Sequence, residues 1–265
     1  MTAAREYSFV EMLLTPGQGG RPGRKIVPKA VVIHWTANTN PGANAVANRN
    51  YFENHPQNKV SAHYIVDDRQ VVQCLPENEM AYHVGANRYQ PKALELLSSY
   101  PNDCTIGIEM CVNKDSDFNK TYRNTVALTA DILRRYGWGV DRLWRHYDIT
   151  WKNCPWFFVS DEAARAYGFP SATEGWELFK KDVQQVLKGE AYDDMFKDMA
   201  GHWAKKDVEE AAKLGLVAGK GDGTFAPDEG MTRAQGTVVT LRAYKKLDTK
   251  IAALEKRLAE LEGRV

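Results

Sequence analysis

The stretch CTIGIEMCV, residues 104–112, decides the fold class of this chain. It is strongly β-type, and strand alternation divides its central side chains between two faces. One face carries Ile106, Ile108 and Met110, and the other carries Gly107, Glu109 and Cys111. Burying a carboxylate inside such an apolar strand is costly unless the carboxylate is paired or functional. Glu109 is therefore the first candidate for a functional residue.

Three further β-type stretches precede this strand: AVVIHW (30–35), VSAHYIVDD (60–68) and QVVQCLP (70–76). Helical patterns are predicted over residues 43–55, 120–137 and 175–189, and Gly137 suits the C-cap of the second helix. Strands that alternate with helices predict an α/β domain over residues 1–189, with a mixed central β-sheet flanked by helices.

Composition argues against several classes of protein. The 265 residues are 43% hydrophobic and 26% charged, with a formal net charge of +1. The sequence therefore lacks the basic excess that is typical of nucleic-acid-binding proteins. No apolar run approaches the length of a membrane span. The N-terminal stretch MTAAREYSFVEMLL is not a secretory signal, because Arg5, Glu6 and Glu11 surround its short apolar segment. We therefore expect synthesis in the cytoplasm, so that any action outside the membrane requires release.

Two histidines and a cysteine form a candidate metal site. His34 lies near the end of AVVIHW, and His146 precedes Cys154 in LWRHYDITWKNCPW. Two imidazoles and one thiolate suit zinc and leave a fourth position open for water, as in catalytic sites. The alternative is a hydrogen-bonded core histidine beside a small buried thiol. The four cysteines of the chain are expected as thiols or metal ligands rather than as a disulfide framework.

Glu109 and Lys152 would complete such a site. A carboxylate could deprotonate a water and pass the proton to a leaving amine. Lys152, two residues before Cys154, could stabilise a developing oxyanion. Each could instead be a structural ion-pair partner.

Together, VVIHWTAN, VSAHYIVDD, EMAYHVG, TIGIEMC and HYDITWKNCP resemble the type 2 N-acetylmuramoyl-L-alanine amidases, zinc enzymes whose superfamily includes the peptidoglycan recognition proteins. The resemblance spans about residues 28–157. It implies a mixed sheet flanked by helices with zinc in a surface groove. It also implies hydrolysis of the amide between the lactyl group of N-acetylmuramic acid and L-alanine. By motif, the ligands of a single Zn²⁺ become His34, His146 and Cys154, with Lys152 as the electrostatic partner.

One position departs from many relatives, which carry a catalytic tyrosine where this chain has Ala62. The sequence is more similar to the Bacillus-type and phage endolysin branch, in which a glutamate of the IGIE strand is catalytic. Glu109 occupies that place. His63 and His83 lie within the motifs, and each either contacts the substrate or has a structural role.

The sequence changes character after Gly189, with a short polar linker over residues 190–195. Residues 196–246 resemble a single S-layer homology repeat, through FKDMAGHWA, GKGDGTFAP and MTRAQ. The expected fold is a small all-α unit with Thr232 as an N-cap. Such repeats bind secondary cell-wall polymers, and the resemblance implies Arg233 as the contact to an anionic ligand. Gln235 stands where glutamate is usual.

Residues 247–265 have a heptad pattern. Positions a are Ile251, Leu258 and Val265, and positions d are Leu247, Leu254 and Leu261. Lys250 and Arg257 at g face Glu255 and Glu262 at e in a parallel arrangement. We expect an amphipathic coiled-coil helix that joins chains into a homo-oligomer, so that several single repeats share one wall-binding assembly. The alternative is a helix packed on its own domain.

The resulting hypothesis is a peptidoglycan hydrolase, either a phage endolysin or a bacterial autolysin, that acts at the bacterial cell wall. An alternative is a non-catalytic wall-recognition protein that uses the same groove. Relatives that only bind typically lose the cysteine ligand, whereas Cys154 is present. A structural spore or S-layer protein would leave the complete catalytic set unexplained.

Overall fold

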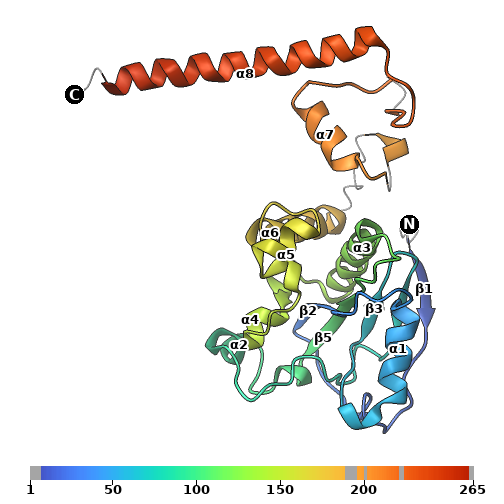
Figure 1. Ribbon diagram of the computed structural model, residues 1–265. Coiled ribbons are helices and arrows are strands. Elements are labelled where there is room, and N and C mark those ends of the chain that lie inside the picture. The colour runs from blue at the N-terminus through green and yellow to red at the C-terminus, as the bar shows by residue number, and fades with distance from the viewer. Residues whose placement is uncertain (1–6, 189–195, 200–201, 221–223, 263–265) are drawn as a thin grey trace. The chain divides into compact units, whose positions relative to one another are not determined.

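The computed structural model describes residues 7–188, 196–199, 202–220 and 224–262. The chain forms two compact units, Met1–Tyr192 and Asp193–Val265 (Figure 1). The expected linker, residues 190–195, lies outside the described residues.

The first unit is built on one six-stranded sheet with the order β1-β4-β3-β5-β2-β6. Only β3 and β4 pair antiparallel, and the other neighbours are parallel, so the sheet is mixed as expected. The strands are β1 Ser8–Glu11, β2 Ala30–Trp35, β3 Tyr64–Val66, β4 Gln70–Gln73, β5 Thr105–Met110 and β6 Leu143–Arg145.

Helices cover both faces of this sheet (Figure 1). Ile106, Ile108 and Met110 of β5 are fully buried in the core that also contains the apolar residues of α3 and α6. On the opposite face, α1 packs over β3 and β4, and α4 packs beside β2 and β6. The helices of this unit are α1 Ala45–Asn54, α2 Pro91–Leu96, α3 Phe118–Tyr136, α4 His146–Thr150, α5 Asp161–Ala166 and α6 Ala172–Leu187.

The long helices end where local sequence signals place their ends. Asp117 caps α3 by accepting hydrogen bonds from two backbone N–H groups. Gly137 ends that helix with a φ of 66°, a left-handed conformation that glycine adopts without strain. Ser171 caps α6, which therefore starts three residues before the predicted helix 175–189. The prediction of both helices is confirmed, with small shifts at their ends.

The strands are shorter than the β-type stretches of the sequence. The predicted strand 60–68 contains regular strand only at Tyr64–Val66, because Ser61 donates its backbone N–H to Tyr82 in a loop rather than to a strand. Strand β1 was not expected, since it is a short edge strand that pairs only with β4. Its burial is partial, so its sequence carries little alternation.

The second unit has the expected order of helix, turn and helix, with α7 at Lys205–Lys213 and α8 at Arg233–Glu262. The carboxylate of Asp198 accepts the backbone N–H groups of Phe225 and Ala226 at 2.8 and 2.6 Å, which ties the start of the repeat to its turn. Helix α8 runs without a break through residue 246. The expected boundary at 246/247 therefore lies inside one helix.

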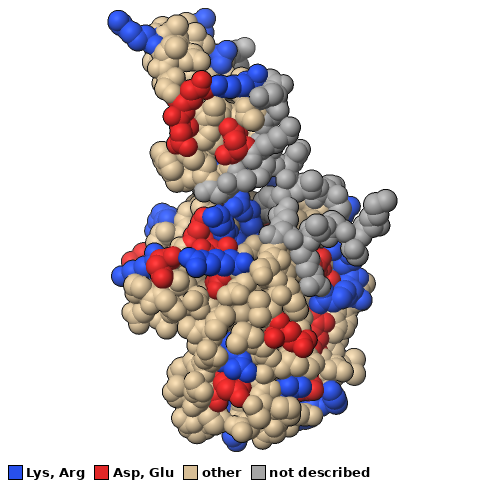
Figure 2. Space-filling model, turned by 90° about the vertical axis from the view of Figure 1, so that its right-hand side faces the viewer, with Lys and Arg blue, Asp and Glu red and all other residues tan. Residues whose placement is uncertain are grey.

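None of the helices in the described residues is long and apolar enough to cross a membrane. On the face drawn in Figure 2, the Lys and Arg side chains are interspersed with the Asp and Glu side chains.

Candidate metal centre and active site

Three elements bring His34, His146 and Cys154 together. His34 lies near the carboxyl end of β2, and His146 begins α4 directly after β6, the parallel neighbour of β2. Cys154 follows α4 in the next loop. All three side chains are buried, and one nitrogen from each ring and the Cys154 Sγ lie within 4.8 Å of one another.

The geometry of this trio fits zinc. Tetrahedral Zn²⁺ with usual Zn–N and Zn–S bond lengths separates a nitrogen and a sulfur ligand by about 3.6 Å. In the structure, His34 Nδ1 and Cys154 Sγ are 3.6 Å apart. His146 Nδ1 is buried and has no hydrogen-bond partner in the described part of the chain. Coordination to a metal would satisfy this nitrogen.

The protonation of these groups also suits a metal ligand set. Burial, together with the neighbouring His146 and His83, holds the pKa of His34 well below its usual value. Burial, followed by the charge of Lys152, lowers the pKa of His146 to about 3. Both rings are therefore neutral, which is the form that binds metals. Burial raises the pKa of the Cys154 thiol, so a thiolate there requires a cation beside it.

The trio lies in a groove with a volume of about 930 Å³. Strand β2 and its following loop, helix α1, the loop before β3 and the loop after α4 all contribute to its walls. Glu109 and Lys152 line the same groove, as do His83 and Asn102. The volume lies within the range of small-molecule binding sites.

Glu109 faces the groove from β5, where it is the register partner of His34 on the adjacent parallel strand. Its Oε2 atom is buried and has no hydrogen-bond partner among the described residues. Burial raises the pKa of Glu109 to about 8, and Lys152 acts in the opposite direction. A positive charge at the trio would likewise favour the carboxylate form, which is the form that accepts a proton.

Lys152 enters the groove from the loop between α4 and Cys154. Its side chain is exposed, and no ion-pair partner for it occurs among the described residues. The preceding Trp151 has a φ of 62°, an uncommon conformation for a non-glycine residue that turns the chain at the end of α4. Lys152 can therefore present a free ammonium group to a ligand in the groove.

The two remaining motif histidines have different surroundings. His83 lines the groove, and its Nδ1 lies 3.0 Å from His34 Nε2. His63 is fully buried, and backbone groups engage both of its ring nitrogens, Gly107 N at 3.0 Å and Glu79 O at 2.8 Å. The sequence left open whether His63 contacts the substrate or has a structural role. These hydrogen bonds favour the structural role. Ala62 is buried in the core and offers no hydroxyl group.

The residues that hold His83 were not among the predicted site residues. Asn102 Oδ1 accepts the backbone N–H groups of His83 and Val84 at 3.1 and 2.9 Å. Gly107 leaves room for the ring, because a Cβ at that position would lie 2.7 Å from His83 Nδ1. An isolated glycine inside a strand is a signal of close approach and could have indicated this contact.

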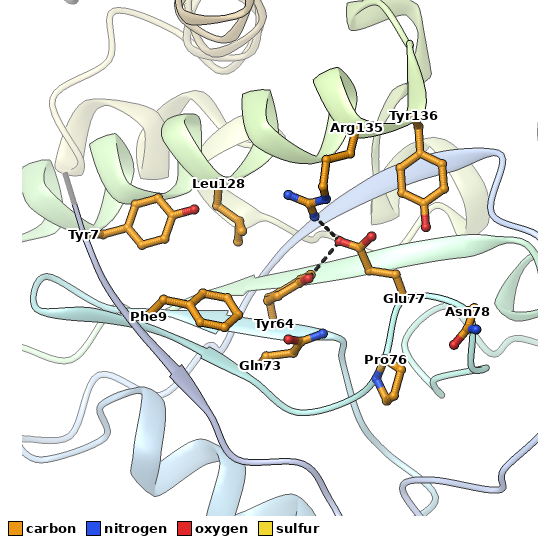
Figure 3. Close-up of a pocket in the computed structure, with 10 residues that line it drawn as sticks. All are labelled: Tyr7, Phe9, Tyr64, Gln73, Pro76, Glu77, Asn78, Leu128, Arg135 and Tyr136. Atoms are coloured by element: carbon orange, nitrogen blue, oxygen red, sulfur yellow. Dashed lines mark hydrogen bonds and ion pairs between the residues drawn. The ribbon is translucent and has the colours of Figure 1, made fainter. Parts of the chain in front are cut away.

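Another cavity, of about 540 Å³, lies on the α3 face of the sheet (Figure 3). Figure 3 shows the Glu77 carboxylate between Tyr64 and Arg135, and Tyr64 donates its hydroxyl to Glu77 at 2.7 Å. These three side chains satisfy one another's polar groups. Through them, the loop after β4 is joined to α3. This cavity lacks the histidine and cysteine donors of the groove. The groove therefore remains the candidate active site.

All four cysteines, which were expected as thiols or metal ligands, are free and buried. In the second unit, Arg233 is exposed at the first residue of α8, with no ion-pair partner in the described ranges. Thr232 caps this helix by accepting the backbone N–H of Gln235 at 3.2 Å. The Gln235 side chain accepts the backbone N–H of Thr232 in return, at 2.8 Å.

Residues 22–157, just over half of the chain, match the family described as N-acetylmuramoyl-L-alanine amidase. The chain belongs to this amidase family. The match covers the trio, Glu109 and Lys152, all of which lie in the first unit. Residues 196–235 match the S-layer homology domain.

Proteins of Bacillus are among the curated relatives of this amidase family member. A probable N-acetylmuramoyl-L-alanine amidase of Bacillus licheniformis is 40% identical over 54% of this chain and 41% of its own length. The N-acetylmuramoyl-L-alanine amidase BlyA of Bacillus subtilis is 38% identical over 53% of this chain and 40% of its own. The matched region thus spans about two fifths of the length of these relatives.

Solved structures show the same fold for the first unit. The catalytic domain of XlyA is 28% identical with a TM-score of 0.53, and the match covers 66% of this chain and 99% of that domain. A mutant endolysin from Bacillus subtilis is 29% identical with a TM-score of 0.54, and the match covers 67% and 99%. The expected fold, a mixed sheet flanked by helices, is therefore confirmed.

Proposed function

We propose that this chain is a zinc-dependent peptidoglycan hydrolase that cleaves the amide bond between the lactyl group of N-acetylmuramic acid and L-alanine. The observation that carries the proposal is the buried trio of His34, His146 and Cys154 in one groove with Glu109, whose Oε2 atom has no hydrogen-bond partner among the described residues. Family membership and the names of the curated relatives support the reaction.

Each residue of the groove has a distinct task in this proposal. His34, His146 and Cys154 hold one Zn²⁺, which when bound lowers the pKa of a water and polarises the scissile carbonyl. Glu109 removes a proton from the attacking water and delivers it to the departing amine of L-alanine. Lys152 stabilises the negative charge that develops on the carbonyl oxygen.

The activity is tested with purified peptidoglycan, by loss of turbidity and by the appearance of new L-alanine N-termini. Glu109→Gln should retain zinc and lose about 10²–10⁴-fold in rate, because a proton-transfer group is removed. Cys154→Ser should lose zinc and activity together. The matched controls are Glu95→Gln, an exposed carboxylate of α2, and Cys104→Ser, a buried thiol outside the trio.

Two outcomes would contradict this proposal. Clearing of the suspension without new amino groups would indicate a glycosidase. Zinc and peptidoglycan binding without any cleavage would indicate the alternative, a non-catalytic wall-recognition protein.

For the second unit, we propose binding to a secondary cell-wall polymer, with Arg233 as the contact to its anionic groups. The S-layer homology match supports this role, as does the exposure of Arg233, which has no ion-pair partner within the described part of the chain. Arg233→Ala should reduce cosedimentation with walls that retain the polymer, and Lys245→Ala on the same helix should not. Equal binding to walls stripped of the polymer would defeat the proposal. The protein thus acts at the bacterial cell wall, as an endolysin or an autolysin.

We also propose that chains self-associate in parallel through the heptads of residues 247–265. The described side chains at a and d are largely exposed on α8, namely Leu247 60%, Ile251 53%, Leu254 67% and Leu258 57%. Lys250 and Glu255 have the spacing of a g-to-e pair between parallel helices. Val265 lies outside the described residues. A second copy of the same helix would cover this apolar surface and pair these charges.

Tyr244, an exposed residue at the preceding position a, extends this apolar stripe into the repeat. A truncation at residue 246 would cut this surface, so point variants give the sharper test. Leu254→Glu should convert the oligomer into monomers in sedimentation equilibrium, because it places a charge at a d position. Thr249→Glu, at the outward position f, should leave the oligomer intact. A monomeric unmutated chain would overturn the proposal.

A further inference from the structure

The ring of His83 lies between His34 and the first residue of β5. Its Nε2 atom is 3.2 Å from both the carbonyl oxygen and the hydroxyl oxygen of Thr105. A carbonyl can only accept a hydrogen bond, and the Thr105 hydroxyl donates its own proton to Pro101 O at 2.6 Å. His83 Nε2 must therefore carry a proton that it donates to Thr105.

The proton on His83 Nε2 determines the direction of the hydrogen bond between His83 and His34. A neutral imidazole with a proton on Nε2 has a lone pair on Nδ1. His83 Nδ1 lies 3.0 Å from His34 Nε2, so His34 donates its Nε2 proton to His83. The lone pair of His34 then lies on Nδ1, the atom that is 3.6 Å from Cys154 Sγ. A hydrogen-bond chain that starts at a backbone carbonyl thus directs the His34 lone pair toward the metal position.

Two other residues hold His83 in this chain. Gly107 provides the space for the ring, since a Cβ there would lie 2.7 Å from the ring atoms Cγ and Nδ1. Asn102 is fully buried and accepts the backbone N–H of His83 at 3.1 Å. Ring and backbone of His83 are therefore fixed independently.

We infer that His83 is a positioning residue that sets the tautomer and orientation of the zinc ligand His34, with Gly107 as the residue that makes room for it. This inference rests on the proposed zinc site. Outer partners of ligating histidines fix the tautomer in this way and raise the basicity of the ligand.

His63 provides a matched control within the same core. It is also fully buried, and its ring centroid lies 5.8 Å from that of His83. Both of its ring nitrogens bond to backbone groups of Gly107 and Glu79, with none directed at His34. Removing His63 should therefore disturb packing without changing the tautomer of the ligand.

The test measures the zinc dissociation constant of the full chain by competition with a chromophoric chelator, alongside the melting temperature. His83→Ala should weaken zinc binding about 10–100-fold. Gly107→Ala should also weaken it, because the added methyl group displaces the ring. His83→Gln should recover part of the affinity, since its side-chain oxygen can accept the His34 Nε2 proton. His63→Ala should lower the melting temperature and leave zinc affinity unchanged.

Nitrogen-15 NMR of the unmutated, metal-free chain provides a second readout that needs no variant to fold. We expect His34 and His83 each to carry their proton on Nε2. A proton on His34 Nδ1 overturns the inference, as does an equal loss of zinc affinity in His63→Ala and His83→Ala. Normal zinc binding in every variant overturns only the positioning role. An unmutated chain that binds no zinc overturns the metal site itself, and the positioning role with it.

Discussion

Glu79 joins the loop that carries His83 to the segment before β2. Its carboxylate accepts Arg21 Nε at 2.7 Å and Lys25 Nζ at 3.1 Å, and its side chain is 9% exposed. Its backbone carbonyl accepts the His63 ring. The hydrogen bond from Arg21 is the largest of the effects that hold the pKa of Glu79 below its usual value. Glu79 thus forms an ion pair through its side chain and holds the buried His63 ring through its backbone.

We expect Glu79→Gln to lower the free energy of unfolding by about 1–3 kcal/mol at pH 7, because Arg21 would lose a charged partner in a nearly buried position. The lowered pKa means that the carboxylate stabilises the fold above its unfolded pKa and loses this effect as pH falls through its folded pKa. The difference between the two proteins should therefore shrink on acidification. Chemical denaturation at pH 7 and at lower pH measures it, with Glu95→Gln as the control. A difference that grew on acidification would contradict this account.

The start of helix α8 explains how the repeat tolerates glutamine at position 235. The reciprocal hydrogen bonds between Thr232 and Gln235 form a capping box, a motif that accepts either glutamate or glutamine at its third helical position. The altered signature residue therefore preserves the helix start.

Thr232→Ala should destabilise the second unit by about 1 kcal/mol, because the side chain that accepts the Gln235 N–H is lost. Gln235→Glu should keep the cap, since a carboxylate accepts the same backbone N–H. Thermal unfolding followed by circular dichroism compares the two variants with the unmutated chain. Thr237→Ala, one turn later on α8, controls for the loss of a threonine that bonds only within the helix. Equal effects at positions 232 and 237 would mean that the cap contributes nothing.

At the scale of the whole molecule, the chain combines two units whose stabilities rest on different features. The first has an extensive buried core on both faces of the sheet, and the proposed zinc site lies within it. In the second, Phe196 and Met199 are buried, whereas many apolar residues of α8 are exposed. Metal removal should therefore act on the first unit.

Chelation of zinc should lower the stability of the first unit by about 3–4 kcal/mol relative to free zinc at 100 to 1,000 times its dissociation constant. Differential scanning calorimetry with and without chelator measures the shift, and readdition of zinc should reverse it. The unfolding of the second unit should not respond. A chelator effect that persists in Cys154→Ser would show that the stabilising metal binds elsewhere.

Features that depend on neighbouring residues could be predicted before the fold was known. Alternation in residues 105–110 determined which face of β5 carries Glu109, and Gly137 determined where α3 ends, because each signal acts within a few residues. The motifs also indicated the ligand types of the trio, and the structure brings those three residues together.

The relations between distant segments, in contrast, became visible only in the folded chain. The sequence could not distinguish His63 from His83, since each lies within one of the family motifs and neither motif shows what its ring contacts. Their different roles arise from Gly107 of β5. This residue lies against the ring of His83 and donates its backbone N–H to the ring of His63. The edge strand β1 likewise depends on its pairing with β4, more than fifty residues away. Such contacts are set by how the sheet assembles, and no local pattern encodes them.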